Sequence, residues 1–180
     1  VGGTIEMNDL VTLTFPPNAI VDKNGNNFNG FVAVVIKYLD PTLHTMYNEM
    51  PGALIGQNQN KQDVVLESYG MIGVWLSDFN GNSLNLKPGE KCKMTTKIPE
   101  TMRNYAPTVM PLWHFDESAG IWIEEGSATR DGDYYVGEVS HFSYWNFDYP
   151  RPLVHIKGKL TNGGDSFTEG IVSIGIEGQN

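Results

Sequence analysis

Residues 139–148 read VSHFSYWNFD, and the alternation of aromatic with polar side chains in this run is typical of a β-strand. The triplet at its centre, His141-Phe142-Ser143, allows two interpretations. Either it belongs to ordinary strand alternation, or Ser143 lies where its hydroxyl attacks the peptide bond that precedes it. In both cases we expect the segment to be a β-element held in the core, because only a rigid frame orients a hydroxyl or supports a scaffold.

The rest of the chain has the same texture, with Val, Ile, Thr, Tyr, Phe and Trp in short bursts between Gly, Asn, Asp and Pro. Alternation in VTLTF directs Val11, Leu13 and Phe15 to one face, while FVAVVIKYL (31–39) is apolar enough to be buried on both faces. About eight strands follow at short spacing, two of them joined by the turn DESAG. These features predict an all-β fold, an antiparallel β-sandwich, with most tryptophans in its interior.

The length of 180 residues fits one ordinary domain, or one domain plus a fragment of a second. A composition break at YPRP (149–152) predicts a sandwich over 1–149 and an appended hairpin or partial module over 150–180. Residues 40–63 show no clean period, so we expect this connection to be functional or mobile. The chain opens on Val1-Gly2-Gly3 without an initiator methionine, which predicts an excised piece or a mature form.

The charge and the cysteine count argue against several classes of function. A net charge of −9 without any basic run disfavours nucleic acid and anionic membrane surfaces as partners. No apolar run approaches the length of about 18 residues that a membrane-spanning helix needs. Cys92 is the single cysteine, so neither an intrachain disulfide nor a thiolate metal cluster is expected, and a cysteine in a strand is usually inert.

The opening residues, Gly2-Gly3 followed by VTLTFPPNAI (11–20), resemble the start of the ZU-five domain. This β-sandwich occurs in ankyrins, zonula occludens proteins and netrin receptors, where an apolar strand ends in Pro-Pro-Gly-Ala-Ile. Asn18 stands in place of that glycine here, and asparagine tolerates the left-handed backbone that the turn requires.

The second half is similar to an extracellular variant of that domain seen in cartilage intermediate layer proteins and in bacterial surface proteins. The matching motifs occur in order and cover most of residues 1–149. They are Leu39-Asp40-Pro41-Thr42, Met50-Pro51-Gly52, Gly70-Met71, Pro111-Leu112-Trp113, Gly120-Ile121-Trp122 and His141 to Asn146. The tail from about Leu153 resembles the first hairpin of a carboxypeptidase-regulatory-like module, which implies a partial second domain.

This resemblance implies a non-catalytic structural or adhesion module of a larger extracellular surface protein, with a bacterial source expected. Its implied partners are the neighbouring domains of the same protein and a glycan or protein ligand. Neither a cofactor nor a metal ion is expected.

The alternative function is autoproteolysis, because several relatives of the fold cut themselves between Phe and Ser by an N-to-O acyl shift. The implied reacting groups are the Phe142 carbonyl and the Ser143 hydroxyl. His141 and Ser143 share a face but lie about 7 Å apart along a strand, so a base on a facing strand is better placed. By resemblance, His114 and Glu125 (or Glu124) would supply it.

Three further kinds of site are weighed. The turns DKNGNN (22–27), SDFNGN (77–82) and TRDGD (129–133) contain oxygen ligands suited to calcium, but turn chemistry explains them and no EF-hand loop is complete. The four histidines, His44, His114, His141 and His155, are too scattered in the sequence to predict a zinc site. A third function, binding of a carbohydrate or peptide through residues 40–63, remains open.

Overall fold

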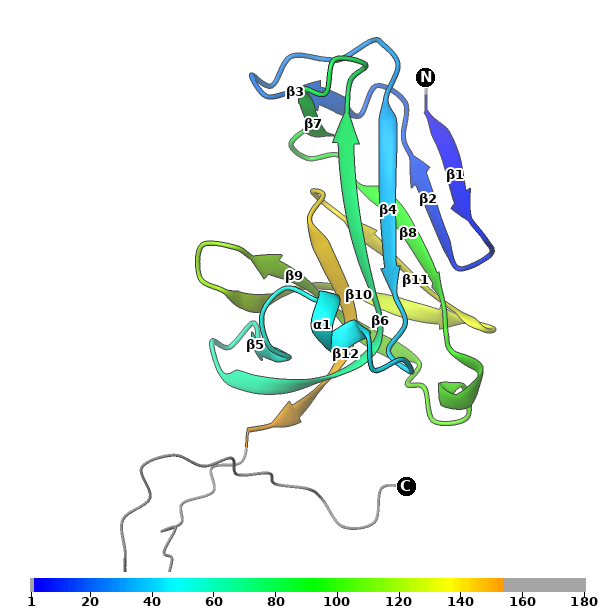
Figure 1. Cartoon of the computed structure of the whole chain (residues 1–180), viewed down its shortest axis with the longest axis vertical. Coiled ribbons are helices and arrows are strands. Elements are labelled where there is room, and N and C mark those ends of the chain that lie inside the picture. Colours follow the sequence, from blue (N-terminus) through cyan, green and yellow to red (C-terminus); the bar gives the residue numbers. More distant parts are fainter. Residues whose placement is uncertain (1, 154–180) are drawn as a thin grey trace, which may run out of the picture.

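The computed structural model describes residues 2–153 (Figure 1). Of the tail module predicted at 150–180, these include only residues 150–153. The elements are β1 (Gly3–Met7), β2 (Val11–Phe15), β3 (Ile20–Asp22), β4 (Ala33–Leu39), α1 (Met46–Glu49), β5 (Ile55–Gln57), β6 (Asp63–Ser77), β7 (Ser83–Leu86), β8 (Cys92–Lys97), the short 3₁₀ helix η1 (Glu100–Met102), β9 (Val109–Asp116), β10 (Ile121–Asp131), β11 (Tyr134–Val139) and β12 (Tyr144–Pro152).

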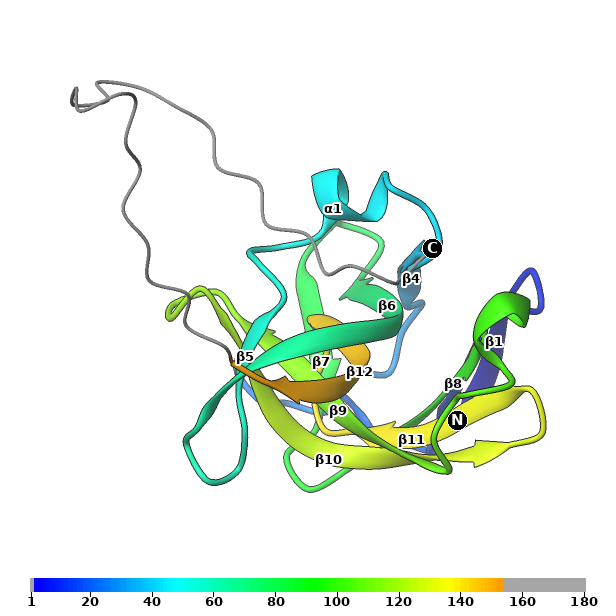
Figure 2. The same cartoon turned by 90° about the horizontal axis from the view of Figure 1, so that it is seen from below.

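The described strands form one hydrogen-bonded sheet in the order β1-β2-β8-β11-β10-β9-β12-β6-β7-β3, with β4 and β5 paired beside this path. Pairing is antiparallel except between β5 and β10, which run parallel for two residues. Figure 2 shows the sheet from below, with β9, β10 and β11 forming a layer beneath β6 and β12. The predicted all-β sandwich is confirmed.

The prediction of about eight strands was too low, because the residues that the structure describes form a sheet of 12. Among the missed strands are β1, β3 and β5, which contain 5, 3 and 3 residues. A run this short holds too few alternations to be recognised from its pattern.

β6 is the spine of the sheet, with 15 residues that pair with four other strands. β5 pairs with residues 63–65 of β6 and β12 with residues 64–73, while β4 pairs with residues 71–77 and β7 with residues 76–77. In Figure 1 it runs along most of the height of the described part of the chain.

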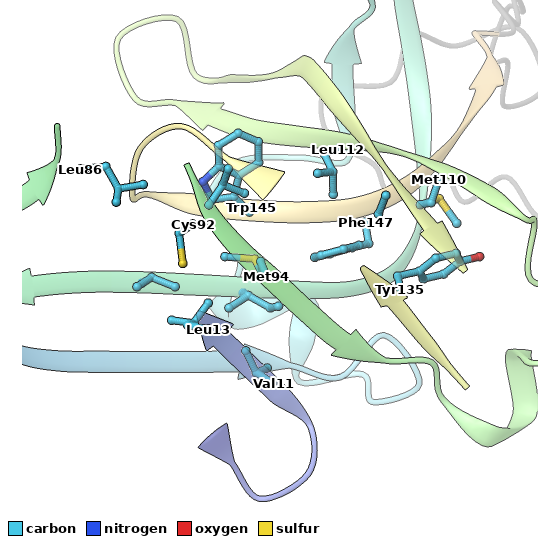
Figure 3. Close-up of a cluster of buried hydrophobic side chains, with 14 of the residues drawn as sticks. Val11, Leu13, Leu86, Cys92, Met94, Met110, Leu112, Tyr135, Trp145 and Phe147 are labelled. Atoms are coloured by element: carbon cyan, nitrogen blue, oxygen red, sulfur yellow. The ribbon is translucent and has the colours of Figure 1, made fainter. Parts of the chain in front are cut away.

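Two buried clusters lie on opposite sides of β6 and β9. Figure 3 shows the larger one, in which Trp145 and Phe147 of β12 project among side chains of the facing strands. The smaller cluster contains Trp113 and Trp122. Cys92 is fully buried in the larger cluster, where burial raises the pKa of its thiol to about 12 and disfavours the reactive thiolate.

Three of the four tryptophans are fully buried, as predicted, whereas Trp75 is 41% exposed and packs edge-on against Tyr144. In β2, Val11 and Leu13 are also fully buried, as the alternation predicts. Consecutive residues of β9, Leu112 and Trp113, enter different clusters because neighbouring side chains of a strand point to opposite faces.

The turn after β2 has the conformation that the sequence predicts. Asn18 has φ 58°, in the left-handed region where asparagine is tolerated. Gly2 lies so close to this turn that a Cβ atom there would approach the Phe15 carbonyl oxygen to 2.5 Å. A side chain at Gly2 would therefore displace the strand that begins the sheet.

The position of β4 differs from the prediction. The sequence interpretation placed FVAVVIKYL in the interior, buried on both faces, and this is wrong. This strand pairs with β6 alone, so its other edge is free of strand partners in the described part of the chain. Val35 is 57% exposed and the preceding Phe31 is 68% exposed. An apolar run does not distinguish an edge strand from a central one.

The connection at residues 40–63 is folded, with α1 and β5 inside it. Met46 of α1 is buried in the smaller cluster, and Gly56 of β5 lies against the Trp113 ring. β12 continues through Tyr149–Pro152 in register with Val64–Glu67 of β6, so the composition break falls within a paired strand. The predicted partial module lies outside the described residues beyond Leu153.

A buried polar ladder connects β6 and β12 on the face opposite Trp145. The Ser68 hydroxyl donates to Asn146 Oδ1 (2.8 Å), and Asn146 Nδ2 donates to Asp148 Oδ2 (2.5 Å). Asp148 is fully buried, and its burial raises the pKa of the carboxyl well above its ordinary value. Its other oxygen, Oδ1, has no partner among the described residues, so a charge there would be poorly solvated.

We predict that this ladder makes the protein less stable as the pH rises. The folded state keeps the Asp148 proton above the pH at which the unfolded chain releases it, so the folded state binds more protons between the two pKa values. The free energy of unfolding is therefore greatest below the unfolded pKa and falls above it, by at most about 1.4 kcal/mol per pH unit.

Asp148→Asn keeps the shape and the acceptor for Asn146 but removes the titration. Urea unfolding at pH 4, 5, 6 and 7 should show the native protein losing stability relative to the variant as the pH rises. A constant difference between the two proteins would contradict a neutral, buried Asp148.

Candidate functional site

The triplet His141-Phe142-Ser143 lies in the bend at 140–143, between β11 and β12, and not within a strand. The interpretation of the triplet as strand alternation is therefore wrong for these three residues, although β12 begins immediately after them at Tyr144. A bend allows His141 to turn back over the strand that follows, which an extended backbone would not allow.

Two further side chains named from the sequence meet His141 over the first residues of β12. His114 comes from β9 and Glu125 from β10. Glu125 Oε2 lies 3.6 Å from Nε2 of His114 and 3.6 Å from Nε2 of His141. The two imidazole rings are perpendicular, with centroids 4.8 Å apart. We call these three residues the His-Glu-His cluster.

The Trp145 ring packs against both imidazoles of the His-Glu-His cluster. In the pairing of β9 with β12, His114 is the register partner of Trp145, so both side chains lie on the same face. The Trp145 ring lies 5.7 Å from that of His114 and 5.0 Å from that of His141, measured between centroids. Its indole N–H donates to the His141 carbonyl oxygen (3.0 Å), which fixes the backbone of the bend over the strand.

Glu125 is held from its other side. The Ser140 hydroxyl donates to Glu125 Oε1 (2.5 Å), which leaves Oε2 directed at the two imidazoles. The regular register of β10 with β9 breaks between Glu124 and Ser127, and Gly126 within this bulge has φ 79°. The neighbouring carboxylate, Glu124, instead accepts a bond from the backbone N–H of Gln59 (3.1 Å).

The electrostatics of the cluster favour a neutral His114. Burial lowers the pKa of the His114 imidazole, and the charge of a protonated His141 lowers it further. The Glu125 carboxylate acts in the opposite direction. A neutral imidazole has a free nitrogen lone pair, which is the form that accepts a proton or binds a metal ion.

The Phe142–Ser143 peptide bond is anchored on both sides. The Phe142 N–H donates to Asn85 Oδ1 (3.1 Å), and the Ser143 carbonyl accepts from the Val74 N–H (3.1 Å). The Phe142 ring packs on Phe15, with centroids 5.6 Å apart. These contacts restrict the backbone around the bond that autoproteolysis would cut.

The Ser143 hydroxyl is engaged with the backbone. It donates to the carbonyl oxygen of Tyr144 (3.2 Å). This bond must break before an imidazole can take the hydroxyl proton.

The structure thus brings together His114, Glu125 and His141, all named from the sequence, next to Phe142 and Ser143. It also corrects the statement that the histidines are too scattered for a metal site, because residues distant in sequence meet where β9 pairs with β12. Sequence reasoning missed Ser140 and the supporting role of Trp145. A hydroxyl directly before the triplet was the available signal for Ser140.

Asp-Asn turns account for two of the segments considered for calcium. Asp22 Oδ1 accepts from the backbone N–H groups of Asn24 (2.8 Å) and Asn26 (2.9 Å), and Asp78 makes the corresponding pair of bonds within 77–82. The hydrogen bond from the Asn26 backbone is the main cause that lowers the pKa of the Asp22 carboxyl, and the bond from the Asn82 side chain is the main cause that lowers the pKa of Asp78. The expectation of turn chemistry is confirmed for these two segments.

Residues 40–63 contribute Pro41, Tyr47 and Leu54 to an open groove that Glu67 and Arg151 also line. The ion pair between Glu67 and Arg151 (2.7 Å) lies at this groove. Binding of a carbohydrate or peptide here stays a prediction.

The chain is similar to the cartilage intermediate layer protein 1 of Mus musculus, with 26% identity over 125 residues. The similarity covers 69% of this chain and 10% of the mouse protein, so the chain spans about a tenth of the length of that relative. No known family profile and no solved structure matches the chain. No helix within residues 2–153 is long and apolar enough to cross a membrane.

Burial lowers the pKa of the His114 imidazole and the Glu125 carboxylate raises it, so a change at Glu125 should shift this pKa. Glu125→Gln keeps an acceptor for Ser140 but removes the negative charge that raises the pKa of the His114 imidazole, so that pKa should fall further. Titration of the imidazole signals by two-dimensional NMR measures the change.

Glu124→Gln is the matched control, because it removes an adjacent carboxylate that bonds to Gln59 and not to the histidines. A His114 pKa that rises in the Glu125 variant, or that falls equally in both variants, would show that Glu125 does not face the imidazole.

Proposed function

We propose that this chain is a non-catalytic structural module of a larger extracellular surface protein, and that it holds neighbouring domains in fixed positions relative to each other. The observation that carries this proposal is the single continuous sheet of the described residues, in which β12 pairs with β6 from Tyr144 to Pro152 and with β9 at Trp145, Asn146 and Phe147. The similarity to a protein named for cartilage supports an extracellular setting. A bacterial source and an adhesive role belong to the same proposal, by resemblance to bacterial surface proteins.

The positions of the two ends of the described chain suit a module joined in series. β1 begins near the top of Figure 1, and β12 ends at the bottom. The final residues of β12 are paired with β6, and Arg151 there contacts both Glu67 and the Tyr149 ring. A load applied at Pro152 would therefore enter β6, the central strand of the described sheet, through direct pairing.

The extracellular location has a direct test. An antibody raised against residues 1–153 should label intact source cells, and external trypsin should remove the label while a cytoplasmic marker protein stays intact. Labelling that appears only after the cells are permeabilised would contradict the proposal.

A second candidate function is autoproteolysis between Phe142 and Ser143, favoured by the position of the His-Glu-His cluster beside this anchored bond. Ser143 Oγ would form a bond to the Phe142 carbonyl carbon while an imidazole takes its proton. The C–N bond would then break, and the nitrogen would receive that proton to become an amine. Water would hydrolyse the resulting ester to a Phe142 carboxylate and a free Ser143 hydroxyl.

Denaturing electrophoresis and intact-mass measurement separate the two candidates. The non-catalytic proposal predicts one uncut chain after prolonged incubation, with a pattern identical to that of Ser143→Ala. A fragment ending at Phe142 in the native chain, absent from the Ser143→Ala chain, would replace the first proposal with the second.

A further inference from the structure

The His-Glu-His cluster has a geometry that neither the structural role nor self-cleavage requires. Its three potential ligand atoms all lie within 4.8 Å of one another. They come from three segments: β9, the bulge of β10, and the bend before β12. We propose that His114, Glu125 and His141 bind a divalent transition-metal ion, with Zn²⁺ as the ion of choice.

The distances fit this ion. Zn–N and Zn–O bonds of about 2.1 Å place tetrahedral ligands about 3.4 Å apart. Glu125 Oε2 lies 3.6 Å from each imidazole nitrogen, so both of these pairs need to close by only a few tenths of an ångström. The pair of histidines needs to close by at most about 1.5 Å. Rotation of the His141 side chain, which is more exposed than that of His114, would make this adjustment while the His141 carbonyl stays bonded to Trp145.

Neighbouring residues orient the three candidate ligands by hydrogen bonds and ring packing, as they do in known metal sites. Outer hydrogen bonds commonly orient ligating carboxylates and imidazoles. Ser140 occupies Glu125 Oε1, so a single oxygen remains for the ion. Trp145 supports both rings from below and fixes the His141 backbone through its indole N–H. The cluster is therefore supported by residues that do not themselves ligate.

The exposure of the cluster gives the ion a route in and a free coordination position. The side chains of His114, His141 and Glu125 are 20%, 33% and 42% exposed, respectively. Three protein ligands leave a fourth tetrahedral position for water or for a group from another molecule. Two imidazoles and one carboxylate suit Zn²⁺, whereas Ca²⁺ requires six to eight oxygen ligands.

A bound ion would cross-link β9, β10 and the bend before β12, and would stabilise the folded state by mass action. It would also occupy the nitrogen lone pairs that a general base needs. Metal binding and self-cleavage would therefore compete for the same imidazoles. The metal site does not depend on the structural role proposed above, and its failure would leave that role unaffected.

The test is titration of the full chain, treated with EDTA and dialysed, with ZnCl₂ in a calorimeter. We expect one Zn²⁺ per chain. Thermal unfolding at a hundredfold excess over Kd should show Tm raised by roughly 5–10 °C. Co²⁺ added in place of Zn²⁺ should give visible absorption bands of the intensity that four-coordinate sites show.

The variants Glu125→Gln and His141→Ala should each abolish the one-equivalent binding and the rise in Tm, while remaining folded without metal. Ser140→Ala should weaken binding roughly ten- to a hundredfold without changing the stoichiometry, because Ser140 only positions Glu125. His44→Ala and His155→Ala are the controls, since they remove the other histidines of the chain.

Binding only at millimolar Zn²⁺, or binding that persists in Glu125→Gln and His141→Ala, would overturn the metal site. Loss of binding in His44→Ala or His155→Ala would overturn it as well. Since Ser143→Ala keeps all three ligands, its zinc affinity should equal that of the native chain, whatever its effect on self-cleavage.

Discussion

The structure depends on the pairing of β12 on both of its edges. On one side it pairs with β6 from Tyr144 to Pro152, and on the other it pairs with β9 through Trp145, Asn146 and Phe147. β12 and the three-residue strand β5 are the elements that join the β6 half of the described sheet to the β9–β10 half. Burial of Trp145 and Phe147 between the layers contributes on the order of 2–3 kcal/mol per side chain, so these two residues hold the halves together.

The His-Glu-His cluster is a consequence of this pairing. The register that buries Trp145 also places His114 opposite it, and the bond from the Trp145 indole to the His141 carbonyl folds the bend back over the same ring. The three ligand candidates therefore share a rigid support, while their side chains stay partly exposed. The cluster combines a fixed backbone with a local site that solvent and ions can reach.

The sequence predicted the class of fold and the identity of the cluster residues, for different reasons. Alternation of apolar residues and turn chemistry suffice for the sandwich and the buried tryptophans, whereas the turn at Asn18 was expected from the resemblance to the ZU-five domain. His114 and Glu125 came from a resemblance to self-cutting relatives. The meeting of His114 with His141 was not predictable, because it depends on the register of two strands separated along the chain and on bulges near Glu125 and Asn146 that the pattern does not mark. Edge position, which exposes Val35, is likewise a property of the whole sheet and not of the run that contains it.

Hydrogen exchange tests the central position of β12 most directly. The backbone amides of Trp145, Asn146 and Phe147 should exchange only through global unfolding, and they should be among the slowest of the chain, because both neighbours must separate before β12 opens. If the experiment is run in a low concentration of denaturant and repeated without it, exchange of these amides should be slower without it, because removing denaturant raises the free energy of unfolding. Rapid exchange at these three residues, with protection retained in β6 and β9, would show that β12 is not the strand that joins the two halves, and the account of the cluster would fail with it.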